Sequence, residues 1–131
     1  MTAGANPPVA APRRVLVAED EFLVYLALEE DLRANGYEVI GPFTNVADVR
    51  RAAAEETIDL ALLDINLAGE MVWPVADALL ARNIPFIFLS GYASAAVPDS
   101  YRHYPRLEKP YDPARLLQAI RTLAAESIPA P

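Results

Sequence analysis

The chain has 131 residues, of which 53% are hydrophobic, and a formal net charge of −7 at pH 7. This length suits one domain with one core, and the hydrophobic share is too high for a disordered chain. The negative charge argues against nucleic acid as the main partner, and the absence of cysteine excludes disulfides and thiolate metal sites. There is no signal-like N-terminus and no apolar run near the ~18 residues of a membrane span, so we expect a cytoplasmic protein without a membrane partner.

Five short apolar segments are predicted to be β-strands. In chain order they are residues 14–18, 37–41, 59–64, 86–89 and 106–108. The second segment alternates weakly between polar and apolar residues and is expected at the edge of a sheet. Leu60–Leu63, in the third, shows no alternation, which is typical of a strand covered on both faces.

Helical patterns separate or follow these segments. They predict helices over Phe22–Arg33, Val46–Glu55, Val72–Arg82 and Pro113–Glu126, with Asn45 and Asp112 as N-caps. In the first helix, Phe22, Leu26 and Leu32 are expected to form the apolar stripe. Residues 93–104 are rich in alanine but contain Pro98, so any helix there is expected to be short or broken.

The alternation of strands and helices predicts an α/β fold, with a doubly wound, five-stranded parallel sheet and helices on both faces. Residues 1–12 are expected to be a disordered leader rich in proline and alanine. Residues 13–126 would form the domain, and residues 127–131 a short tail with no output domain. Ile65–Glu70 is expected to be a loop.

Polar residues stand where the predicted strands end, which in open parallel sheets is where ligands bind. These residues are Glu19, Asp20, Asp64, Ser90 and Lys109, the last being the only lysine of the chain. Three carboxylates repel one another unless a cation joins them, and oxygen ligands favour Mg²⁺, or Mn²⁺ in its place. With a hydroxyl and an ammonium alongside, the set suits a phosphoryl group, which a carboxylate can accept as nucleophile.

Four motifs together carry a resemblance to a known family. They are Val-Leu-Val-Ala-Glu-Asp-Glu at 15–21, Leu-Leu-Asp-Ile-Asn-Leu-Ala-Gly at 62–69, Leu-Ser-Gly-Tyr at 89–92 and Glu-Lys-Pro at 108–110. In this order and spacing, the sequence resembles the receiver domain of two-component response regulators over nearly all of residues 13–126. The resemblance implies a flavodoxin-like fold and a signalling phosphoprotein that catalyses only its own phosphorylation and dephosphorylation, rather than a conventional enzyme.

The resemblance also implies a role for each polar residue. It makes Asp64 both the phospho-acceptor and a member of the metal site, Asp20 a direct metal ligand and Glu19 an acidic neighbour that often acts through water. The backbone carbonyl of Asn66 would complete the Mg²⁺ site, while Ser90 and Lys109 would bind the phosphoryl group. The implied phosphoryl donor is a histidine kinase or a histidine phosphotransfer protein. The chain would be a single-domain regulator, either a monomer or a weak dimer. Its phosphorylation would switch the binding of a downstream protein that the sequence does not identify.

Three departures from the family pattern bear on switching. The family usually has proline where Ala68 stands, so we expect a looser turn there. Arg106 occupies the position of the usual aromatic switch. Residues 85–92 instead resemble a subgroup with a Pro-Phe-x-Phe-x-(Thr/Ser)-Gly-Tyr signature, known from alphaproteobacterial stress and light signalling, and we expect Tyr92 to act in the switch together with Ser90.

Two other functions use similar residues. A phosphohydrolase of the haloacid dehalogenase type needs a second acid two residues after the nucleophilic aspartate, and that position holds Asn66. A pseudo-receiver would be a binding module that is never phosphorylated, which the complete set of polar residues argues against.

Overall fold

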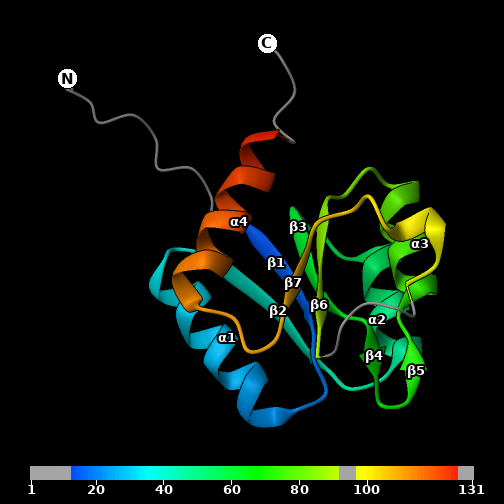
Figure 1. Cartoon of the computed structure of the whole chain (residues 1–131), viewed down its shortest axis with the longest axis horizontal. Coiled ribbons are helices and arrows are strands. Elements are labelled where there is room, and N and C mark those ends of the chain that lie inside the picture. Colours follow the sequence, from blue (N-terminus) through cyan, green and yellow to red (C-terminus); the bar gives the residue numbers. More distant parts are fainter. Residues whose placement is uncertain (1–12, 92–96, 127–131) are drawn as a thin grey trace.

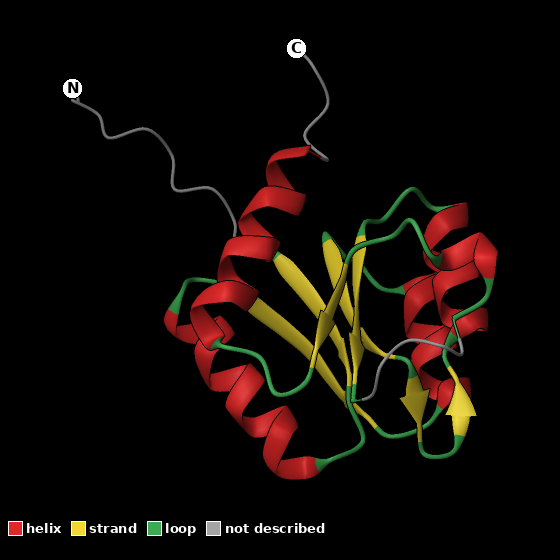
Figure 2. Cartoon of the chain, viewed as in Figure 1, coloured by secondary structure: helices red, strands yellow, loops and turns green. Residues whose placement is uncertain are grey.

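The computed structural model describes residues 13–91 and 97–126, which form one parallel sheet with helices on both faces (Figures 1 and 2). The five strands lie in the order β2-β1-β3-β6-β7, and all are parallel. They are β1 (Arg14–Ala18), β2 (Glu38–Phe43), β3 (Leu60–Asp64), β6 (Phe86–Ser90) and β7 (Arg106–Glu108). The predicted fold class is therefore confirmed, and β2 lies at an edge as expected.

Four α-helices cover the sheet in the described part of the chain. They are α1 (Phe22–Ala34), α2 (Val46–Glu55), α3 (Trp73–Ala81) and α4 (Pro113–Glu126), each within two residues of its predicted bounds. The caps are as predicted: Asn45 Oδ1 accepts a hydrogen bond from Asp48 N at 2.9 Å, and Asp112 Oδ1 accepts one from Ala114 N at 2.9 Å. Of the helices described, none is long and apolar enough to cross a membrane.

The two faces of the sheet have separate cores, because successive side chains of a strand point to opposite faces. In β1, Leu16 packs with α2 and α3, whereas Val15 and Val17 pack with α1 and α4. β3 is buried along its whole length, so both of its faces are covered. The central strands of the sheet are therefore held between two apolar layers, and the polar residues Asp64 and Ser90 lie at the ends of β3 and β6.

The predicted apolar stripe of α1 is confirmed at Leu32 but wrong at Phe22 and Leu26. The residues that α1 buries are Tyr25, Leu28 and Leu32, whereas Phe22 is 66% exposed and Leu26 is 38% exposed. The helix carries two apolar stripes, and its buried residues, three and four positions apart, are the ones that face the sheet. Phe22 and its neighbour Leu23, which is 78% exposed, are thus left on the surface.

The connection between β6 and β7 contains only a 3₁₀ turn, η1 (Asp99–Tyr101), in the residues that are described. For residues 97–104 this agrees with the expectation of a short or broken helix, while residues 93–96 of the predicted segment lie outside the described residues. The turn is fixed by aromatic packing: the ring of Tyr101 stacks on Trp73 at 4.8 Å between centroids, and its hydroxyl donates to Asp77 Oδ1 at 2.6 Å. That hydrogen bond, together with burial, raises the pKa of Tyr101 to about 12.

A short hairpin stands where the sequence predicted a loop. Strands β4 (Asn66–Leu67) and β5 (Glu70–Met71) pair antiparallel around a two-residue turn. Both turn residues have positive φ, 52° at Ala68 and 88° at Gly69, which is the signature of a type I′ turn. Leu67 is fully buried and anchors the hairpin to the core. The expected looser turn at Ala68 is therefore wrong, since the turn is tight and closed by strand pairing.

Candidate functional site

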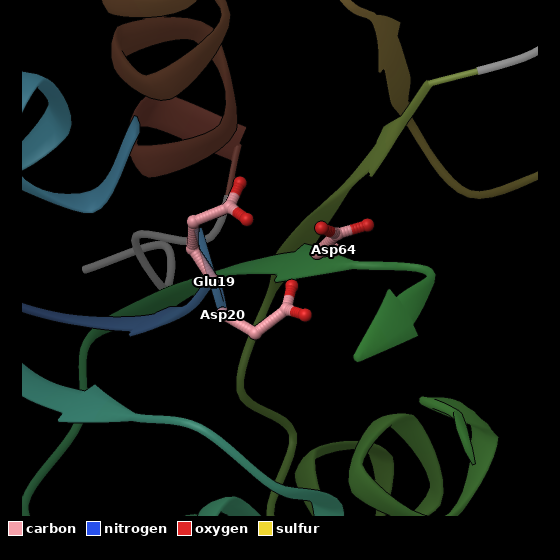
Figure 3. A group of neighbouring side chains, drawn as sticks. All are labelled: Glu19, Asp20 and Asp64. Atoms are coloured by element: carbon pink, nitrogen blue, oxygen red, sulfur yellow. The ribbon is translucent and has the colours of Figure 1, made fainter. Parts of the chain in front are cut away.

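The carboxyl ends of the parallel strands meet at one rim of the sheet, at its lower edge in Figure 1 beside the β4–β5 hairpin. Glu19 and Asp20 directly follow β1, and Asp64 is the last residue of the neighbouring strand β3. Each of the three offers a carboxylate oxygen within 4.8 Å of the others. Figure 3 shows the three side chains gathered at these two strand ends.

Lys109 joins this group from the far end of the chain. Its Nζ donates to Glu19 Oε1 at 2.6 Å and to Asp64 Oδ2 at 3.1 Å. Glu19 is 1% exposed and Asp64 is 7% exposed, so the lysine neutralises charges that have little access to water. A compact ammonium suits this position, since it can donate to two carboxylates at once from a narrow stem.

Burial and ion pairing act in opposite directions on these groups. Burial raises the pKa of the Glu19 carboxyl above its ordinary value, although the hydrogen bond from Lys109 opposes the change. Burial also acts to lower the pKa of Lys109, but its bonds to Glu19 and Asp64 outweigh this effect and raise the pKa. Lys109 is thus held as a cation. Its positive charge does not fully offset the burial of the Glu19 carboxylate.

The other predicted site residues lie at the same rim or beyond the described part. Ser90 ends β6, is 8% exposed, and its backbone carbonyl accepts a hydrogen bond from Lys109 N at 2.6 Å. Asn66 begins the hairpin, and its backbone N–H donates to Asp64 Oδ1 at 3.3 Å. Tyr92, the predicted switch residue, lies outside the described residues. The single histidine, His103, is exposed and packs on Tyr104, as expected of a surface residue.

Sequence reasoning missed two contacts at the rim. The backbone N–H of Ala68 donates to Asp20 Oδ2 at 3.1 Å, across 48 residues of chain. The only sequence feature that pointed to this contact was the turn predicted at Ala68-Gly69, where backbone N–H groups are free to donate. Glu21, for which the sequence predicted no role, places Oε1 3.9 Å from Lys109 Nζ. Its side chain is 67% exposed, so this ion pair contributes little.

The donor set at the rim fits a hard divalent cation. Three carboxylates face one ammonium, so the cluster carries excess negative charge that a divalent ion would offset. All of the clustered ligand atoms are oxygens, which is the preference of Mg²⁺ and Mn²⁺. The rim thus brings together a group of acids that could hold a metal ion, the buried carboxylate of Asp64 and the ammonium of Lys109.

Comparisons with known proteins agree with this geometry. Residues 15–121 match the response regulator receiver domain. The chain therefore belongs to this family, and its fold is that of the receiver domain of a two-component response regulator. This match covers most of the chain, whereas the subgroup signature at residues 85–92 remains a prediction.

Individual relatives span the whole described domain. The chain is 35% identical to SdrG from Sphingomonas melonis Fr1, with a TM-score of 0.77 over 88% of this chain and 98% of that one. A receiver protein from Sinorhizobium medicae WSM419 is 26% identical, with a TM-score of 0.77 over 89% and 98% of the two chains. The transcriptional regulatory protein PdtaR from Mycobacterium tuberculosis is 30% identical over 85% of this chain. This chain spans about half of that relative, 56% of its length.

Proposed function

We propose that the protein accepts a phosphoryl group on Asp64 in a Mg²⁺-dependent reaction and thereby switches the binding of a partner protein. The observation that carries the proposal is the bridge from Lys109 Nζ to both Glu19 and Asp64, with Asp20 beside them. A lysine held between a nucleophilic carboxylate and a metal-binding acid is an arrangement that serves phosphoryl transfer. The donor that fits this family is a phosphohistidine on a cytoplasmic kinase or phosphotransfer protein.

The transfer balances without any other reactant. A carboxylate oxygen of Asp64 attacks phosphorus and forms the new P–O bond, while the P–N bond to the donor imidazole breaks and its electron pair returns to the ring. Lys109 pairs with the phosphoryl oxygens, and the Ser90 hydroxyl donates to one of them. Glu19, Asp20, Asp64 and the backbone carbonyl of Asn66 would hold Mg²⁺, which would offset the negative charge of the phosphoryl oxygens in the transition state.

A second candidate, phosphohydrolysis of the haloacid dehalogenase type, finds less support. That chemistry needs an acid two residues after the nucleophile, and the residue there is Asn66. Its side-chain oxygen accepts a hydrogen bond from Gly69 N at 2.9 Å, so this amide closes the hairpin turn. A general acid is therefore missing at the position where the mechanism requires one.

The first test is uptake of phosphate from acetyl phosphate. We expect intact mass spectrometry to find one added phosphate in the presence of Mg²⁺ and none in EDTA, because the carboxylate cluster needs a cation to approach a phosphodonor. Asp64→Asn preserves side-chain shape and is expected to take up none. A protein that gains no phosphate and releases none over time would be a pseudo-receiver. Phosphate that persists in Asp64→Asn would place the acceptor elsewhere.

The protein donor has an apolar surface on which to dock. A groove of about 710 Å³ runs between α1 and the segment after β7, and Gly91 and Lys109 line it at the rim. Leu23 also lines this groove and, with Phe22, is an exposed large apolar side chain. We propose that the phosphohistidine donor docks here, since Lys109, which lines the groove, donates a hydrogen bond to Asp64, the group that the donor imidazole must reach.

Replacing Leu23 with glutamine tests this docking surface without adding charge at the rim. Phosphotransfer from a phosphorylated histidine kinase is expected to slow about tenfold or more, because the interface loses a central apolar contact. Labelling by acetyl phosphate is expected to be unchanged. Ala54→Gln places the same side chain at an exposed position of α2, on the opposite face, and is expected to affect neither rate. Equal kinase rates in both variants would exclude this groove as the docking site.

A further inference from the structure

The β4–β5 hairpin touches two of the three acids through its backbone. The N–H of Ala68 donates to Asp20 Oδ2 at 3.1 Å, and the N–H of Asn66 donates to Asp64 Oδ1 at 3.3 Å. Asp20 is an exposed residue, and among the residues that the structure describes Ala68 is its only hydrogen-bond partner, whereas Glu19 is buried and bonded to Lys109. The hydrogen bond from Ala68 therefore orients the one exposed carboxylate of the cluster.

The hairpin is rigid enough to act as a support. Leu67 is fully buried, and Val72 N donates to Ile65 O at 2.9 Å across the base of the hairpin. At its tip, the side chain of Asn66 accepts a hydrogen bond from Gly69 N at 2.9 Å. Ala68 adopts φ of 52°, a conformation that L-residues rarely adopt, and this conformation brings its N–H to Asp20. Such a strained residue persists only where its surroundings determine its conformation.

We propose that the Ala68 backbone N–H is a positioning group for the cation site, holding one oxygen of Asp20 so that the other is presented to Mg²⁺. This rests on the proposed function, because it assumes that the acids bind Mg²⁺. Mg²⁺ demands near-ideal octahedral geometry, so a carboxylate whose rotation is already fixed loses less freedom on binding. Groups that orient metal ligands in this way commonly change metal affinity 10- to 100-fold.

Whether the hydrogen bond to Asp20 can form depends on which residue occupies position 68. Proline at this position would have no N–H, and its φ near −65° would be incompatible with this turn. Any residue with an amide N–H that tolerates positive φ can keep the bond, and glycine does so most readily. The role therefore belongs to the backbone, and a variant that changes only the N–H is the sharpest test.

The experiment is isothermal titration with MgCl₂ of three proteins: the wild type, Ala68→Gly, and a protein with L-lactic acid at position 68. The last replaces the N–H by an ester oxygen and leaves the methyl group and its chirality in place. We expect about tenfold weaker Mg²⁺ binding in the ester protein and wild-type affinity in Ala68→Gly. Ala68→Pro is a second variant without the donor and is expected to weaken binding at least as much. Thermal melts in EDTA show whether each variant is folded.

Each outcome decides between the inference and the function on which it rests. Wild-type protein that binds no Mg²⁺ and takes up no phosphate overturns both. Wild-type protein that binds Mg²⁺ with the same affinity as the folded ester variant overturns the role of the N–H and leaves the proposed function intact. Equal weakening in Ala68→Gly and the ester protein would mean that the turn itself, and not its N–H, supports the site, and would likewise overturn the inference.

Discussion

The Lys109→Met protein is expected to be about 3 kcal/mol less stable than the wild type at pH 7 in EDTA. Methionine matches the length of the lysine stem but leaves the buried carboxylates of Glu19 and Asp64 without their shared cation. Removing one member of a buried ion pair costs this much because the remaining charge is neither solvated nor paired. Urea unfolding followed by circular dichroism measures the difference, and phosphate uptake is expected to fall with it.

The deficit of Lys109→Met is expected to depend on pH in a defined direction. The pKa of Glu19 is raised in the folded protein, so its neutral form favours folding below the ordinary value of 4.5 and this contribution is lost as pH rises through the folded pKa. Removal of Lys109 takes away the hydrogen bond that lowers the pKa of Glu19. The variant therefore loses more stability than the wild type as the pH rises and Glu19 becomes ionised. The gap between the proteins is therefore small in acid and widens toward neutral pH.

A matched control separates the buried pair from a general effect of charge. Arg50→Met removes a positive charge from an exposed position of α2, and its effect on stability is expected to stay within about 0.5 kcal/mol. If Lys109→Met were as stable as this control at neutral pH, the ion pair would contribute nothing to folding. The electrostatic account of the rim would then be wrong.

Phe88→Ala is expected to destabilise the protein by about 3–5 kcal/mol, as is usual for removing a buried aromatic side chain. Phe88 is 1% exposed and lies edge-on to Trp73 at 5.5 Å and to Tyr101 at 6.2 Å between ring centroids. The cavity would therefore open beneath the 3₁₀ turn η1. Because Trp73 is the only tryptophan, its fluorescence is expected to change in the folded variant as well as on unfolding.

Phe88→Leu serves as the conservative control, since it keeps most of the apolar volume and is expected to cost only about 1 kcal/mol. The two variants should therefore differ clearly in their urea midpoints. A Phe88→Ala protein no less stable than Phe88→Leu would mean that the site collapses around the missing ring. In that case the aromatic cluster would not be what fixes η1 to α3.

The sheet and the composition of its rim could be predicted from sequence because both depend on local patterns. Apolar runs such as Leu60–Leu63 mark buried strands, and a polar residue at the end of each run lies at a known edge of a parallel sheet. The clustering of Glu19, Asp20, Asp64 and Lys109 followed from that rule. The assignment of their roles came from the family resemblance and stays a prediction.

What escaped prediction depends on tertiary structure. Strands of two residues, as in the β4–β5 hairpin, are too short to show a period, so the hairpin was taken as a loop. In α1 the sequence holds two apolar stripes, and only the packed sheet decides that Tyr25 is buried and Phe22 is not. The bond from Ala68 to Asp20 joins a backbone donor to a distant side chain, so no side-chain pattern records it.

The bridge between Lys109 and Glu19 has a consequence for when the protein can first act. Its two ends are 90 residues apart in the chain, and β7, which leads into Lys109, is added to the edge of the sheet beside β6. A chain still being synthesised holds the acids of β1 and β3 long before it holds their cation. It cannot assemble the rim until nearly the whole domain has been made and folded. Unfinished or unfolded copies of the chain therefore lack the complete rim, because Lys109 follows all of its acidic partners in the sequence.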